Sequence, residues 1–315
     1  MTNSRTAGLT EEQLRERIAS GRLIEGADYA SEDYLKALER TLIVSADTEL
    51  ISAPSYLGAA AHAPDTTAYM SVLSIVQDEV GHAHIAYRML RDLGVDVDEL
   101  VYGRKPHEFK HPYAFDVPLE SWSDMIVANA FYDRAGFVLL GDVFEHTTYA
   151  PWKRALVKVD REETFHLRHG ERWISKLSQD PDARRRIQES MDWMFILTLE
   201  WFGLPDNLKR HKGQVDYQLK GKTNDELRQT WMSAVVPFCE EHGFDVPAHL
   251  DEEHDTYVID CPFPMSFDAE RKEWDYGKGQ ITWDEVMTRW RERGPANEQF
   301  VKRIQRGYKQ LAQAA

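Results

Sequence analysis

The sequence predicts an all-α protein built on a four-helix bundle. Two observations lead to this prediction. Four long segments carry apolar residues three and four positions apart, and the second and fourth of these segments each carry a Glu-x-x-His pair. A third observation sets the limits of the bundle, because the helical pattern weakens after residue 243 and gives way to β-branched and aromatic residues mixed with Gly and Pro.

The first pair of bundle helices is expected in the N-terminal third of the chain. The first helix is predicted over residues 31–53, with Ser31 as its N-cap. The second is predicted over residues 65–93, where Gly94 provides a C-terminal stop. Residues 95–118 are rich in turn formers and are expected to connect the two pairs.

The second pair is predicted over residues 119–146 and 151–177, since Pro151 is favoured in a first helical turn. A fifth helix over residues 181–202 is apolar on most sides and therefore buried or at an interface. A sixth begins near Thr223, where "TNDE" has the spacing of a capping box.

The remaining residues are predicted to form loops, a short β-hairpin and two closing helices. We therefore divide the chain into a helical metal-binding domain, residues 1–243, and a C-terminal extension, residues 244–315, which packs on the bundle or on a partner subunit.

Composition excludes several classes of protein. The 315 residues carry a formal net charge of −15, which disfavours a general nucleic-acid or anionic-membrane surface. The two cysteines, Cys239 and Cys261, form no Cys-x-x-Cys pair. The N-terminus lacks the apolar stretch of a secretory signal, and no apolar run approaches the roughly 20 residues that a membrane helix needs. These features favour a cytoplasmic protein.

Metal-ligand spacing is the main functional signal. In Glu79-x-x-His82 and Glu163-x-x-His166 the two side chains of each pair share one helix face. A third such pair, Glu108 and His111, lies in the connector and is expected to be an ordinary polar pair of the surface.

An acid precedes each helical pair by the same separation. Glu49 stands 79 − 49 = 30 residues before Glu79, and Asp133 stands 163 − 133 = 30 residues before Glu163. Glu49, Glu79 and Asp133 lie on apolar stripes, where an ionised carboxylate needs a counter-charge. Four carboxylates and two imidazoles from four helices are the ligands of a carboxylate-bridged di-iron or di-manganese centre.

Other polar residues are assigned smaller roles. Glu162 is expected beside the ligands or at the surface, whereas His84, His146 and His169 are expected to be ordinary polar residues. Two basic clusters stand out on an acidic chain. They could be solvated loops, or they could bind phosphate groups or an acidic partner. The candidate binding residues are Arg104, Lys105, Lys209, Arg210 and Lys212.

Five short runs, "VQDEVGH", "SWSDMIV", "YDRAGF", "VKVDREETFHLRHG" and "TNDELRQ", resemble, in order and spacing, the catalytic subunit of the multicomponent phenylacetyl-coenzyme A epoxidase family. The resemblance implies a ferritin-like bundle that binds two iron ions, or manganese, through Glu49, Glu79, His82, Asp133, Glu163 and His166. It also implies that one oxygen atom of O2 is added to the aromatic ring of an acyl-coenzyme A, giving an epoxide. Family members commonly carry a lysine four residues before the glutamate of the second helix, where this chain has Ile75, so the acyl group stays open.

Electrons must come from outside the chain, because it has neither a cysteine set for an iron–sulfur cluster nor a Gly-x-Gly-x-x-Gly motif. We expect a flavin and iron–sulfur reductase that uses NAD(P)H, a companion subunit of similar helical fold, and hence a hetero-oligomer. The alternatives are another di-metal protein (a ferroxidase, a manganese catalase or a radical-generating reductase subunit) and a metal-free scaffold protein of similar fold.

Overall fold

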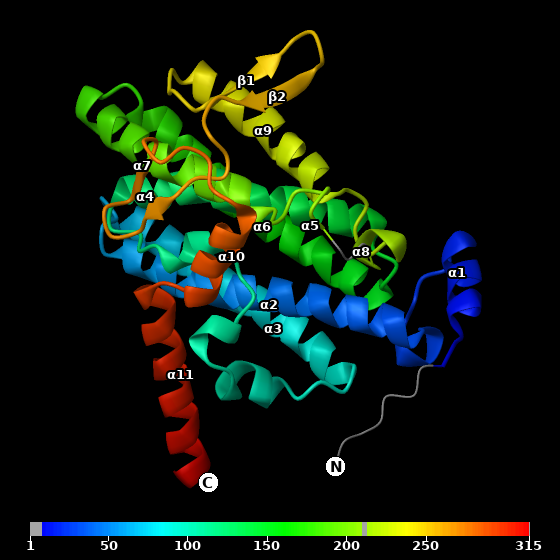
Figure 1. Cartoon of the computed structure of the whole chain (residues 1–315). Coiled ribbons are helices and arrows are strands. Elements are labelled where there is room, and N and C mark those ends of the chain that lie inside the picture. Colours follow the sequence, from blue (N-terminus) through cyan, green and yellow to red (C-terminus); the bar gives the residue numbers. More distant parts are fainter. Residues whose placement is uncertain (1–7, 210–212, 315) are drawn as a thin grey trace.

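A computed structural model describes residues 8–209 and 213–314. Its centre is a bundle of four long helical segments (Figure 1). They are α2 (Glu32–Ala60), α3 (Thr66–Asp92), the composite segment α4 (Trp122–Ala128), η5 (Asn129–Asp133) and α5 (Arg134–His146), and α6 (Ala150–Leu177). The predicted all-α class and the ferritin-like bundle are therefore confirmed.

The first bundle helix begins at its predicted cap, Ser31, and the next two begin at side-chain caps that were not predicted. Ser31, Asp65 and Ser121 each accept a hydrogen bond from a backbone N–H of the following turn. The end of α2 differs from the expectation, since the helix continues through Pro54 to Ala60. Proline removes one helical hydrogen bond, but the buried Tyr56 and its neighbours hold the helix in the core, which outweighs that loss.

A short helix that the sequence pattern did not indicate precedes the bundle. This helix, α1 (Glu11–Ala19), begins with a capping box between Thr10 and Gln13, and it buries Leu14. The connector between the two helix pairs contains only single turns, as expected. They are η2 (Glu99–Gly103), η3 (Pro106–Glu108) and η4 (Tyr113–Asp116).

Among the described residues, three helices follow the bundle between residues 181 and 241. The fifth predicted helix is α7 (Pro181–Trp201), and its C-terminal half is almost entirely buried. After the short α8 (Gly213–Asp216), α9 (Asn224–Glu241) begins with the predicted capping box at Thr223. Trp231 of α9 donates its indole N–H to the carbonyl of Phe131 at 2.9 Å, which fixes α9 on the π-helical segment η5 of the bundle.

The C-terminal residues form two small antiparallel hairpins and two helices. The strands are β1 (Ala248–Asp251) with β2 (Thr256–Ile259) and β3 (Phe267–Asp268) with β4 (Glu273–Trp274), and the helices are α10 (Trp283–Glu292) and α11 (Pro295–Ala314). Trp274 donates to the carbonyl of Trp193 on α7 at 3.1 Å, so the extension packs on the helical body. The domain division at residue 243 stays a prediction. Within the described ranges, no helix has both the length and the apolar character needed to cross a bilayer.

Candidate metal centre

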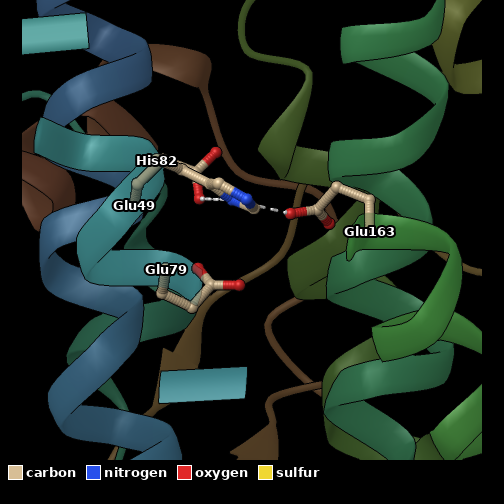
Figure 2. A group of neighbouring side chains, drawn as sticks. All are labelled: Glu49, Glu79, His82 and Glu163. Atoms are coloured by element: carbon tan, nitrogen blue, oxygen red, sulfur yellow. Dashed lines mark ion pairs between the residues drawn. The ribbon is translucent and has the colours of Figure 1, made fainter. Parts of the chain in front are cut away.

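The predicted ligands converge in the middle of the bundle. Ligand atoms of Glu49 on α2, Glu79 and His82 on α3, and Glu163 on α6 all lie within 4.8 Å of one another (Figure 2). All four residues are buried. The spacing that the sequence showed thus corresponds to one cluster.

The other two predicted ligands, His166 and Asp133, lie beside this group. The Nδ1 atom of His166 is 3.2 Å from Glu79 Oε1 and 3.7 Å from Glu163 Oε1, while Nδ1 of His82 is 3.2 Å from that same Glu163 oxygen. Asp133 ends η5 and accepts a hydrogen bond from the Tyr56 hydroxyl. Oε1 of Glu163 therefore lies between the two imidazoles.

The chemistry of the cluster fits metal binding. The Nδ1 atoms of His82 and His166 are buried and face carboxylate oxygens, but neither atom makes a hydrogen bond of good geometry. Burial, and after it the charge of Glu79, raises the pKa of Glu49 and of Asp133 well above the usual range. Burial opposes a positive charge on His82, but the contacts with the carboxylates of Glu163 and Glu49 outweigh it and raise the pKa to about 12. The cluster thus favours cations strongly, and its oxygen and nitrogen donors suit iron or manganese.

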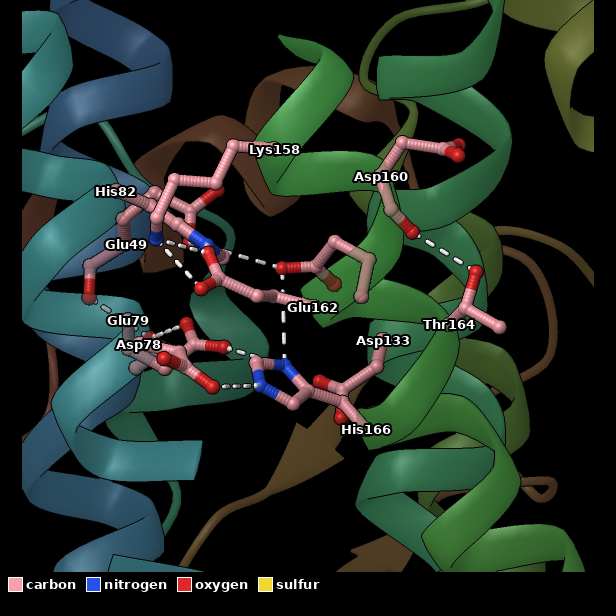
Figure 3. A network of polar contacts seen from close by, with 12 residues as sticks. Glu49, Asp78, Glu79, His82, Asp133, Lys158, Asp160, Glu162, Thr164 and His166 are labelled. Carbon is pink, nitrogen blue, oxygen red and sulfur yellow. Dashed lines mark hydrogen bonds and ion pairs between the residues drawn. The ribbon is translucent and has the colours of Figure 1, made fainter. Parts of the chain in front are cut away.

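A second layer of carboxylates holds the two imidazole rings. Glu162 Oε2 lies 2.9 Å from Nε2 of His82, and Asp78 Oδ2 lies 3.4 Å from Nε2 of His166 (Figure 3). Each pairing fixes the ring so that Nδ1 faces the cluster, the usual arrangement of a metal-bound histidine and its outer carboxylate. Glu162 was expected near the ligands, whereas Asp78 was missed, although each of the two residues directly precedes a ligand glutamate.

Asp133 is held by its own set of partners. Asn129 donates to Asp133 Oδ2 at 2.7 Å, and its amide oxygen lies 2.9 Å from Nδ1 of His169. Burial and the neighbouring His166 lower the pKa of His169 to about 4, so the neutral ring donates Nδ1–H to Asn129. His169, expected to have no special role, orients the amide that orients Asp133. The one sequence signal for these contacts is that Asn129 precedes Asp133 by four residues and so lies on the same helix face.

A cavity of about 400 Å³ reaches the metal centre. Its lining includes the carboxylates of Glu49, Glu79, Asp133 and Glu163 and also basic and amide side chains, among them Lys209, Gln214, Lys220 and Asn224. Aromatic and aliphatic side chains form much of the remaining wall, including Phe115, Tyr132, Leu139, Leu140, Val143, Trp152, Trp201 and Phe202. The space suits a substrate with an apolar group near the metals and a polar or anionic group farther out.

Of the predicted basic residues, some line the cavity and others do not. Lys209 lines the cavity and donates to the amide oxygen of Asn224 at 3.2 Å. Lys220, from the same basic cluster, also lines the cavity and donates to that oxygen at 2.9 Å. By contrast, Arg104 forms an ion pair with the buried Asp47 at 2.6 Å and does not line the cavity.

The other predicted basic residues are Lys105, Arg210 and Lys212. Lys105 is exposed and is not among the lining residues, while Arg210 and Lys212 lie outside the described residues. Ile75 is fully buried in the core and does not line the cavity either.

The remaining histidine predictions have mixed outcomes. His84 is exposed, and His146 pairs with Asp142, as ordinary polar residues do. Glu108 is exposed as expected, but the surface position expected for His111 is wrong. His111 is buried in the cavity wall, 3.2 Å from Asp116, because the connector folds inward against the bundle.

Fold and site together define a ferritin-like helical protein with a carboxylate-rich candidate metal centre. The profile of the phenylacetic acid catabolic protein family matches residues 2–266, and the chain belongs to this family. One curated relative is a subunit of the 1,2-phenylacetyl-CoA epoxidase of Escherichia coli (strain K12). It is 29% identical over 293 residues, which cover 87% of this chain and 93% of the relative.

Proposed function

We propose that the protein is the catalytic subunit of a multicomponent di-iron monooxygenase that epoxidises the aromatic ring of an acyl-coenzyme A such as phenylacetyl-coenzyme A. The observation that carries this proposal is the cavity, which joins the ligand carboxylates to Lys209 and Lys220 through an apolar wall. The family membership and the name of the Escherichia coli relative support the same assignment.

Glu49, Glu79, His82, Asp133, Glu163 and His166 would hold two iron ions, which would supply the electrons that reduce O2. One oxygen atom enters the aromatic ring and the other leaves as water, so each turnover consumes two electrons and two protons. The outer carboxylates Asp78 and Glu162 keep both imidazole rings in the binding orientation.

The protein side of the reaction is positioning and exclusion of water. Phe115, Tyr132 and Trp201 stack edge-on or tilted within 6 Å of one another beside the ligands, forming an apolar pocket for an aromatic ring. Lys209 and Lys220 offer two ammonium groups to the phosphates of coenzyme A. Electrons would come from NAD(P)H through a separate flavin and iron–sulfur reductase, because two cysteines are too few to hold an iron–sulfur cluster and the sequence has no Gly-x-Gly-x-x-Gly motif.

A single-turnover experiment tests the proposal without requiring the reductase. Iron-loaded protein is reduced with dithionite, freed of excess reductant, and mixed with phenylacetyl-coenzyme A and ¹⁸O₂. We expect a product that has gained one ¹⁸O atom, at no more than one equivalent per chain, and no product from free phenylacetate. Screening other aromatic thioesters in the same way identifies the acyl group.

Two results would contradict the assignment. Oxygen consumption that is the same with and without any thioester, with iron retained as an oxide, would identify a ferroxidase. Rapid disproportionation of hydrogen peroxide by the manganese-loaded protein would identify a catalase.

A further inference from the structure

The outer surface formed by α3 and α6 is basic, although the whole chain carries a net charge of −15. We call this surface the α3–α6 face. Its exposed basic residues are His84, Arg88 and Arg91 on α3 and Arg154, Lys158, Arg161, Arg168, Arg172 and Lys176 on α6. Asp92, the last residue of α3, is the single exposed acid of these two fully described helices, and Asp78, Asp160, Glu162 and Glu171 are partly exposed. This concentration of one sign of charge creates a local positive field on an acidic protein.

Several cations of the face are free to meet a partner. Arg154 pairs with Glu25, and Lys158 pairs with Glu162. Arg161, Arg168 and Arg172 make no ion pair among the described residues, although all three are exposed. These three arginines follow one another at intervals of seven and four along α6, so they lie on a single side of the helix.

Apolar side chains lie among these cations. Val157 and Phe165 on α6 are each 44% exposed, and Val80 on α3 is 48% exposed. Exposed apolar side chains mixed with charged ones are typical of a protein–protein contact. The face therefore has both the charge that attracts a partner and the apolar area that holds it.

The α3–α6 face also covers the histidine side of the metal centre. Glu162 contacts Lys158 at the surface and Nε2 of His82 below it, so a single carboxylate joins the face to a metal ligand (Figure 3). On the same seam Asp78 reaches Nε2 of His166, and the side chains of both acids are 24% exposed. The substrate cavity does not use this side, because neither Lys158, Glu162 nor Asp78 lines it.

We propose that the α3–α6 face docks an acidic electron-donor protein. The inference rests on the proposed function, which requires two electrons per turnover from outside the chain. The donor is oxidised by one electron in each of two successive docking events, and the two electrons end in the water formed from the second oxygen atom. A positive face on a negative protein selects an acidic partner. It also orients the donor so that it docks on the side of the bundle that covers the histidine ligands.

A charge-reversal variant and a matched control test the docking. Arg161→Glu/Arg168→Glu/Arg172→Glu changes the face, and Arg303→Glu/Arg306→Glu/Lys309→Glu makes the same change of net charge on exposed positions of α11. The probe is an acidic plant-type [2Fe–2S] ferredoxin in its reduced form. Its binding is measured by biolayer interferometry at low and high ionic strength, and its oxidation by the iron-loaded protein is followed by stopped-flow absorbance.

We expect the α6 variant to bind the ferredoxin roughly 30-fold more weakly at low ionic strength, and to oxidise it correspondingly more slowly, while the α11 variant behaves like the unmodified protein. Reduction of the bound iron by dithionite, and the iron content itself, should be the same in all three proteins. If the unmodified protein holds no iron, the proposed function is wrong. Iron content is measured independently of ferredoxin binding, so this failure can be distinguished from a failure of the docking proposal.

Three outcomes would overturn the docking proposal. They are equal binding by the two triple variants, no binding of the ferredoxin to the unmodified protein, and loss of a co-purifying helical companion protein on reversal of the three α6 arginines. The last result would show that the face is a permanent interface within a complex.

Discussion

Replacing Arg104 with alanine should destabilise the fold rather than weaken substrate binding. Its guanidinium lies 2.6 and 2.8 Å from the two oxygens of Asp47, a carboxylate with no exposed surface. Asp47 also accepts hydrogen bonds from the backbone N–H of Lys110 at 2.7 Å and from the hydroxyl of Tyr87 at 2.5 Å. The ion pair therefore fastens the connector to α2.

The magnitude follows from burial. Removing one member of a buried ion pair costs about 3–5 kcal/mol, because the remaining charge is left without a partner. An unfolding entropy of about 2.1 cal/mol/K per residue gives roughly 0.66 kcal/mol/K for a chain of this length, so Tm should fall by about 5–8 °C.

Thermal unfolding followed by circular dichroism measures this shift. Lys105→Ala is the matched control, since Lys105 is exposed and adjacent, and its Tm should stay within about 1 °C of the unmodified value. An unchanged Tm for Arg104→Ala, together with a raised KM for the thioester, would refute the structural role and return Arg104 to the substrate site.

Three further predictions concern the metals, the cavity and the bundle. His82→Ala and His166→Ala should each lower metal content, measured by atomic emission, while helicity is largely kept; full occupancy in both would refute the ligand assignment. Burial and the adjacent Lys209 lower the pKa of Lys220 to about 8, so its charge is present below that pH and is lost above it. The KM for the thioester should therefore rise as pH passes 8, and in Lys220→Met this rise should be absent; a rise of equal size in both proteins would exclude Lys220. Gly170→Ala places a Cβ 2.5 Å from the carbonyl oxygen of Ile126 and should destabilise by about 1–3 kcal/mol in denaturant titrations, unlike Gly141→Ala, whose Cβ meets nothing within 4 Å.

Much of the fold follows from local patterns in the sequence. The four bundle segments, α7 and α9 were predicted within a few residues, except at the end of α2, because their apolar spacing and caps are local signals. The passage of α2 through Pro54 was not predictable in this way, since it depends on the burial of Tyr56 against residues far along the chain.

The candidate site also has parts that the sequence could predict and parts that it could not. The six candidate ligands could be proposed because their spacing repeats, and the structure brings four of them within 4.8 Å of one another, with His166 and Asp133 beside them. Metal binding by these residues stays a prediction. Asp78 was missed because its contact with His166 crosses between helices, and helical periodicity reports only which residues share a face. Arg104 was assigned to coenzyme A because composition marks a basic residue but cannot show that Asp47, 57 positions earlier, already neutralises it.

The two Glu-x-x-His helices are interlocked across their shared seam. The acid before Glu163 steadies the histidine of α3, and the acid before Glu79 steadies the histidine of α6. Neither half of this internal repeat could therefore orient its own imidazole if it were expressed alone. An ancestral single unit with this sequence pattern would have completed its centre only by pairing with a second copy, and fusion of the two copies would have made that pairing permanent.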